Sequence, residues 1–152
     1  MQKKFELVKS DKITLGEKPL FQVRALMDFS FVKKGELGGY IEKEANLAQN
    51  GNAWVSGNAR VYGDARVSGD ARVYGNAWVY GNAWVSGDAW VYGNARVYGD
   101  ARVSGNAWVS GKVKVEVILC SRFDFSSQAE LNLWLKKEKE FEIEVRKLKE
   151  EK

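Results

Sequence analysis

The amino-acid sequence predicts an all-β solenoid, a three-sided parallel β-helix with a β-rich N-terminal cap and a C-terminal helix. A six-residue unit of Gly, Asn or Asp, Ala, Trp or Arg, Val, and Ser or Tyr occurs ten times without a gap across residues 51–110. A longer period of three units lies inside the first, because Tyr62, Tyr80 and Tyr98 occupy equivalent places. Tandem repeats of this kind indicate a stacked architecture in which each unit is stabilised by its neighbours.

Each unit describes one short strand and one bend. In Ala-x-Val the first and third side chains face one way and the middle one faces the other. We therefore expect Ala and Val to point inward and Trp or Arg to point outward. Gly beside Asn or Asp favours a bend, because these residues tolerate positive φ. Three units per turn then stack equivalent residues roughly 4.8 Å apart. A glycine at every sixth place excludes a helix, and a propeller blade needs about 40 residues per repeat.

The repeat Val-x-Gly-[Asn/Asp]-Ala-x resembles the hexapeptide repeat of left-handed parallel β-helix proteins, most closely those of the YdcK-like and phage-associated type. The resemblance is strong over residues 51–110 and looser over 38–50 and 111–117. Residues 33–42, KKGELGGYIE, are similar to the lead-in of those proteins. Only this resemblance implies a left-handed coil, since the general preference for right-handed crossovers would give the opposite hand.

The N-terminal cap is predicted over residues 1–40. A solenoid has open edges that favour aggregation, so caps are expected at both ends. Within this cap, residues 20–26 alternate in the way a strand does.

The β-helix is predicted over residues 41–117 and is regular over 51–110. Ile41 and Leu47 stand six apart as the repeat valines do, and Ala45 is expected to take the inward place before Leu47. The longer spacing from Leu47 to the next valine predicts an irregular first coil. At the other end, Val113 and Val115 are expected to keep the inward places.

The C-terminal segment, residues 118–152, is predicted to contain an amphipathic helix. Residues 127–130, Ser-Gln-Ala-Glu, have the pattern of a capping box. The apolar stripe expected on this helix consists of Leu131, Trp134, Leu135, Phe141, Val145 and Leu148. Leu133 and Ile143 fall off the stripe. The helix is expected to fold back over the solenoid, with packing against a partner chain as the alternative.

The outward Trp and Arg side chains are the candidate binding residues. The three-unit period places them in three columns, in which the middle coil is entirely tryptophan. The candidates are Arg60, Arg66, Arg72, Trp78, Trp84, Trp90, Arg96, Arg102 and Trp108; the third column also contains Trp54. Arginine stacked on indole is a cation–π contact worth about 0.5–1 kcal/mol at an exposed site. The columns are therefore interpreted as a structural ladder, a self-association interface of a dimer or trimer, or a ligand-binding face.

The residue types present exclude most familiar reaction chemistry. The chain has no histidine and a single cysteine, Cys120. It therefore lacks Ser-His and Cys-His pairs, zinc sites with imidazole ligands, and intramolecular disulfides. Asp64 and Asp100 share a column but lie two coils apart, which makes a poor carboxylate pair. We expect no catalytic residues, no bound metal and no cofactor.

The charge distribution gives only weak support to nucleic-acid binding. The net charge is +4, and the repeat region carries five arginines against four aspartates, a balance of +1. The N-terminal residues lack the apolar run of a signal peptide, and no stretch approaches a membrane span, so a cytoplasmic location without membrane contact is expected.

A non-catalytic binding or scaffold protein is the function that these observations favour. Its partner is expected to be another protein or a second copy of the chain. The phage-like resemblance implies a role directed at a bacterial host protein or a signalling nucleotide. The alternatives are an acyltransferase-like enzyme, and a nucleic-acid or carbohydrate-binding module that uses the Trp and Arg faces.

Overall fold

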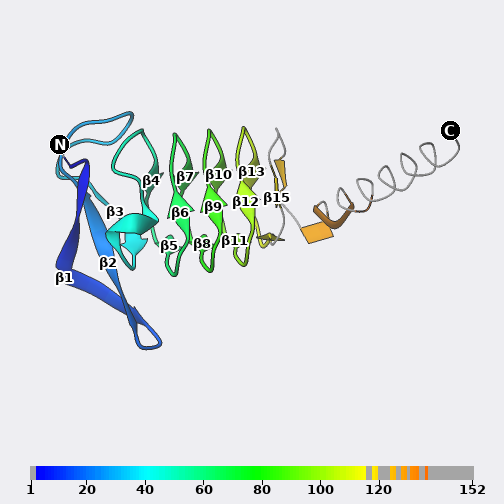
Figure 1. Cartoon of the computed structure of the whole chain (residues 1–152), viewed down its shortest axis with the longest axis horizontal. Coiled ribbons are helices and arrows are strands. Elements are labelled where there is room, and N and C mark those ends of the chain that lie inside the picture. The colour runs from blue at the N-terminus through cyan, green and yellow to red at the C-terminus, as the bar shows by residue number, and fades with distance from the viewer. Residues whose placement is uncertain are drawn as a thin grey trace, which may run out of the picture.

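The molecule is a parallel β-solenoid with a β-hairpin at its N-terminal end, and its coils follow one another in a row (Figure 1). The computed structural model describes residues 3–115, 118–119, 124–125, 128–129, 131–133 and 136. The predicted fold class is confirmed, because consecutive coils are joined by parallel strand pairs whose partners stand three repeat units apart, as Trp78 and Arg96 do.

The N-terminal hairpin continues directly into the solenoid. Strands β1 (Phe5–Leu15) and β2 (Lys18–Ala25) pair antiparallel, and β3 (Leu37–Ile41) pairs antiparallel with β2. The other edge of β3 pairs parallel with β5 (Arg60–Val61) of the next coil. The hairpin is therefore an extension of one solenoid sheet, which covers the edge that the first coil would otherwise expose.

Three parallel sheets form the faces of the solenoid. The first face consists of β3, β5, β8 (Trp78–Val79), β11 (Arg96–Val97) and β14 (Lys114–Val115). The second face consists of β6 (Arg66–Val67), β9 (Trp84–Val85), β12 (Arg102–Val103) and β15 (Ile118–Leu119). The third face consists of β4 (Trp54–Val55), β7 (Arg72–Val73), β10 (Trp90–Val91), β13 (Trp108–Val109) and β16 (Asp124–Phe125).

The core is built from the alanine and valine of every repeat unit, which are fully buried as predicted. Val113 and Val115 continue these columns and are also fully buried. The bends depend on glycine alone, because the repeat glycines have φ between +62° and +73° and no Asn or Asp of the described repeats has a positive φ. At the bends, backbone N–H groups donate to the next coil, as from Asp70 to the carbonyl oxygen of Gly87 at 2.8 Å.

The first coil is irregular, as its spacing predicted. Ile41 pairs with Val61 and Leu47 with Val67, so these partners are farther apart along the chain than those of the regular coils. The extra length lies in the bend after Leu47, while the bend before it forms the 3-10 helix η1 (Glu44–Asn46). The prediction that Ala45 points inward is wrong, because this helix leaves Ala45 exposed.

Asn46 takes the buried place instead. Its amide donates to the carbonyl oxygens of Gly63 at 3.1 Å and Ala65 at 2.8 Å. Its amide oxygen accepts from the backbone N–H groups of Glu42 at 3.2 Å and Lys43 at 2.8 Å. A single side chain thus ties the irregular coil to the regular coil beside it.

Lys4 closes the N-terminal end of the solenoid. It is 2% exposed, and its ammonium donates to the carbonyl oxygens of Ala53 at 2.8 Å and Gly51 at 3.4 Å. Burial lowers the pKa of Lys4 to about 8, against a smaller opposing effect of Asp70. The lysine therefore satisfies backbone acceptors at the end of the coil but carries a desolvated charge.

The helix predicted near the C-terminus is present where the structure describes it, at residues 128–129, 131–133 and 136. Leu131 is buried and Leu133 is 55% exposed, in agreement with the predicted stripe. The amide oxygen of Gln128 accepts from the backbone N–H of Lys114 at 2.7 Å, which links the helix to β14. The other predicted stripe residues, and Ile143 and Cys120, lie outside the described residues.

Candidate functional site

The outward side chains form three ladders, one on each face, as the three-unit period predicted. Each ladder is a column in which an arginine or tryptophan lies directly beside the outward residue of the next coil. The first-face ladder contains Arg60, Trp78 and Arg96, the second-face ladder Arg66, Trp84 and Arg102, and the third-face ladder Arg72, Trp90 and Trp108. The structure thus brings together all nine candidate residues in groups of three.

On the first and second faces, arginines cover an indole from both sides. The guanidinium carbons of Arg60 and Arg96 lie 5.1 Å and 4.6 Å from the Trp78 ring centroid. Around Trp84 the corresponding distances are 5.7 Å for Arg66 and 5.0 Å for Arg102. The alternation also separates the two arginines of each face, which would repel one another in adjacent coils.

On the third face, a guanidinium and two indoles stack in sequence. The guanidinium carbon of Arg72 lies 5.5 Å from the Trp90 ring centroid, and Trp90 stacks on Trp108 at 5.0 Å with an interplanar angle of 7°. The guanidinium carbon of Arg72 also lies 4.4 Å from the ring centroid of Phe31, which comes from the loop before β3. This loop adds one aromatic ring to the ladder that the repeat itself does not supply.

Stacking along the ladders decides which part of each indole a partner can reach. Trp78, Trp84 and Trp90 each have neighbours over both ring faces. Trp84 is still 42% exposed and Trp108 is 40% exposed. The accessible parts of the three doubly covered indoles are therefore ring edges, flanked by the N–H groups of arginine.

Tyrosines form further stacks along two corners of the solenoid. Tyr62, Tyr80 and Tyr98 stack with centroid separations of 5.0 Å and 5.3 Å, and Tyr74 stacks on Tyr92 at 4.9 Å. Burial, followed by the adjacent tyrosine, raises the pKa values of Tyr62 and Tyr74. The Tyr62 and Tyr74 phenols therefore remain neutral at physiological pH, and the stacked rings act as apolar spacers with a polar tip.

Trp54 differs from the other outward residues of the repeat because the N-terminal loop covers it. It stands in the outward position of β4 but is only 6% exposed, because Phe29 packs edge-on against it at a centroid distance of 5.3 Å. Its Nε1–H is buried and has no hydrogen-bond partner among the described residues. Covering of Trp54 by the N-terminal loop could not be read from the repeat, because the loop has no counterpart in it.

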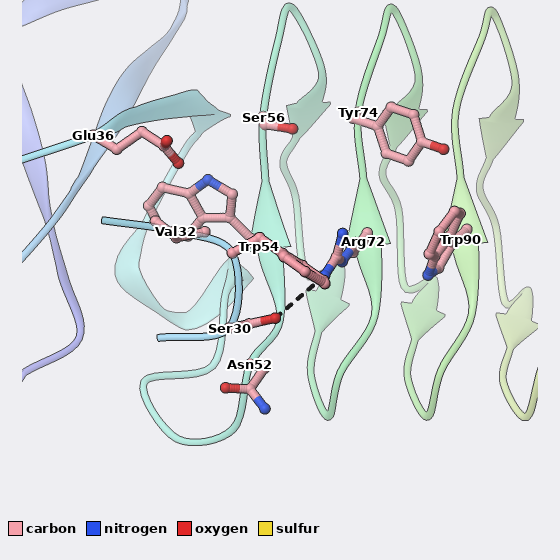
Figure 2. A pocket seen from close by; sticks show the side chains of 10 residues that line it. Ser30, Val32, Glu36, Asn52, Trp54, Ser56, Arg72, Tyr74 and Trp90 are labelled. Atoms are coloured by element: carbon pink, nitrogen blue, oxygen red, sulfur yellow. Dashed lines mark hydrogen bonds between the residues drawn. The ribbon is translucent and has the colours of Figure 1, made fainter. Parts of the chain in front are cut away.

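A pocket of about 280 Å³ lies between this loop and the third face (Figure 2). The loop contributes Ser30, Phe31, Val32 and Glu36, none of which the sequence singled out. The third face and its bends contribute Asn52, Trp54, Ser56, Arg72, Tyr74 and Trp90. The Ser30 hydroxyl accepts a hydrogen bond from Nη2 of Arg72 at 3.2 Å, which anchors the loop to the ladder. Two of the nine candidate residues, Arg72 and Trp90, therefore also line a concave site.

The bend carboxylates do not form a catalytic or metal-binding cluster. Within the described residues, no group of three or more Asp, Glu, His or Cys side chains is placed to hold a metal ion. Asp64 is engaged with Lys43, whose ammonium donates to it at 2.8 Å and lowers the pKa of the carboxyl. In the part of the chain that is described, no helix has the length and apolar character needed to cross a bilayer.

Comparison with protein families identifies the repeat. Residues 53–111 match the model of the YdcK Beta solenoid repeat. The match consists of the overlapping segments 53–69, 65–81, 77–93, 89–101 and 95–111. It covers the regular part of the solenoid and all nine candidate residues, and excludes the cap and the C-terminal segment. No curated protein matches the chain. The resemblance to YdcK-like repeats is thus confirmed, while the left-handed coil and the phage-associated type remain predictions.

Proposed function

We propose that this chain is a non-catalytic binding or scaffold protein whose three ladders form a protein-recognition surface. The observation that carries the proposal is the covering of both ring faces of Trp78, Trp84 and Trp90 by ladder neighbours. Indole edges and arginine N–H groups then face outward from a hydrogen-bonded scaffold. Tryptophan and arginine are the residues that most often anchor protein interfaces.

The order of the ladders favours a protein partner. Each side chain is held between neighbours in the column, so little rotamer entropy remains to be lost on binding. A folded protein can contact ring edges and guanidinium groups over several coils at once. The same surface suits association with a second copy of the chain, as a dimer or trimer, which is the competing use of the ladders.

Nucleic-acid binding on the ladders is less well supported. Proteins that bind single-stranded nucleic acids do so by stacking bases on free aromatic ring faces. The doubly covered indoles offer edges instead, and the repeat region has a net charge of only +1, from five arginines and four aspartates. The same argument weakens a signalling nucleotide as the ligand of the ladders. A bacterial host protein, met in the cytoplasm by a protein of phage-associated type, is the partner class that we favour.

The test compares the wild type with a ladder variant and a matched corner variant. The ladder variant carries Trp78→Ala, Trp84→Ala and Trp90→Ala. The control carries Ser68→Ala, Ser86→Ala and Ser104→Ala, three substitutions in one equivalent corner column. Circular dichroism and thermal unfolding show whether each variant keeps the solenoid. Capture from bacterial lysate, followed by mass spectrometry and binding of the purified candidate, measures recognition.

We expect the wild type and the control to retain the same partner and the ladder variant to lose it. Equal capture by all three forms would remove the ladders from recognition. Light scattering distinguishes self-association from binding to another protein. Self-association through the ladders would give the wild type a mass that is a multiple of 17.1 kDa, and the ladder variant a lower mass. Turnover of acyl-CoA with an amine acceptor by the purified protein would overturn the non-catalytic assignment.

A further inference from the structure

We propose that the pocket between the N-terminal loop and the third face binds one ring of a saccharide. This site shares Arg72 and Trp90 with the third-face ladder, but its other lining residues come from the N-terminal loop, β4 and the bends. The inference rests on the polar groups that line the pocket, on the apolar surface between them, and on the backbone of the loop that closes it.

The first pair of polar groups is the Trp54 indole N–H and the Glu36 carboxylate. The N–H is buried and has no acceptor among the described residues. Figure 2 shows the Glu36 carboxylate on the side of the indole where Nε1 lies. No described residue forms an ion pair with Glu36. Glu36 is exposed to water whereas the indole N–H is buried, so a hydroxyl bound here would accept a hydrogen bond from the N–H and donate one to the carboxylate.

The second pair of polar groups lies across Trp54 from Glu36. The Arg72 guanidinium lies over the rings of Phe31 and Trp90, and its remaining N–H groups donate in the plane of the group. The Asn52 amide nitrogen donates to Asp70 at 3.0 Å, which leaves its oxygen as an acceptor. A donor and an acceptor again line the same pocket. A carboxylate or phosphate could use only the donors, and an ammonium only the acceptors.

Between these polar groups the pocket wall is apolar. Val32, Phe31 and the rings of Trp54 and Trp90 line it. The single positive charge of Arg72 is balanced by the negative charge of Glu36, which favours a neutral ligand. A sugar ring combines hydroxyls along its edges with apolar C–H groups on its faces. The volume of about 280 Å³ is at the small end of ligand sites, which suits one ring.

The loop that closes the pocket has a strained backbone at Ser30. Its φ of +47° is the only positive value among the described residues other than glycine. Such strain is often found at ligand clamps. Here it accompanies the hydrogen bond from Arg72 to the Ser30 hydroxyl and the placement of Phe31, 78% exposed, over the guanidinium.

The test follows the indole N–H signals of the full chain by ¹H–¹⁵N NMR. Trp54→Phe assigns the Trp54 signal. The probes are glucose, galactose, mannose and N-acetylglucosamine. Glycerol is the control for a polyol without a ring, and acetate is the control for an anion. Glu36→Gln removes the charged acceptor. Glu17→Gln, in the exposed hairpin turn, is the matched control.

We expect at least one sugar to shift the Trp54 signal in a saturable way while glycerol and acetate do not. Glu36→Gln should lower the affinity for that sugar about tenfold, which is the effect expected for a lost hydrogen bond to a charged group. Glu17→Gln should leave this affinity unchanged. The proposal is overturned if no sugar moves the Trp54 signal, if acetate moves it as far as a sugar does, or if Glu36→Gln binds as tightly as the wild type.

Discussion

Replacing a bend glycine by alanine tests how closely the coils are stacked. Gly69 has a φ of +66°, and a Cβ added there would lie 2.9 Å from the backbone nitrogen and 3.1 Å from the carbonyl oxygen of Gly87 in the next coil. Gly16, in the turn between β1 and β2, is the matched control. Its φ is +64°, and a Cβ there would have no described atom within 4 Å. The two substitutions impose the same backbone strain but differ in steric contact.

The expected difference follows from these contacts. Alanine at a left-handed φ costs about 1 kcal/mol at either position, after part of the strain is offset by the lower entropy of the unfolded chain. At Gly69 the two coils must also separate, which adds about 1–3 kcal/mol for overpacking. The same shift stretches the bond from the Asp70 N–H to the Gly87 carbonyl oxygen, worth about 1 kcal/mol. Gly69→Ala should therefore destabilise the protein by about 3–5 kcal/mol and Gly16→Ala by about 1 kcal/mol.

Urea unfolding followed by tryptophan fluorescence measures both free energies, and the slope with denaturant shows whether each variant unfolds as the wild type does. Equal destabilisation by the two substitutions would refute the claim that backbone contact between coils, rather than φ alone, requires glycine at the bends.

Two further predictions concern the N-terminal end of the solenoid. Because the folded-state pKa of Lys4, about 8, is below its unfolded value of 10.5, stability should rise by about 2 kcal/mol from pH 8 to pH 10 as the buried ammonium loses its proton. Urea unfolding across this range should show that increment in the wild type relative to Lys4→Met; parallel curves would contradict it. Asn46→Ala should cost about 3–4 kcal/mol, because four backbone groups lose a buried partner. A loss below about 1 kcal/mol on denaturant unfolding, the cost of one ordinary hydrogen bond, would show that water replaces the amide.

The regular coils could be predicted from the sequence because every unit obeys the same local rule. Alternation within Ala-x-Val fixed which side chains are buried, and the three-unit period fixed which ones stack. Both follow from strand geometry, so Trp78 and its two arginines could be placed from the repeat alone. A tandem repeat thus turns a long-range contact into a local pattern.

The first coil and the candidate pocket depend on contacts that no repeat describes. Ala45 lies in a 3-10 turn because Asn46 finds four backbone partners, and such a network has no periodic signal. Trp54 is buried because Phe29 reaches it from the loop that precedes β3. Glu36 lines the pocket because it belongs to the same loop. These placements were set by packing between segments of unlike sequence, which alternation cannot reveal.

The triangular cross-section has a consequence for how such a rod can change its length. Deleting or duplicating three consecutive units would shorten or lengthen the solenoid by one coil, and every outward residue would stay on its original face. Deleting a single unit would instead turn everything downstream by about a third of a revolution, which moves each arginine and tryptophan to a neighbouring side. The number of repeat units therefore sets two quantities. It sets the length of the solenoid, and its remainder after division by three sets the rotation of the C-terminal helix about the solenoid axis relative to the hairpin.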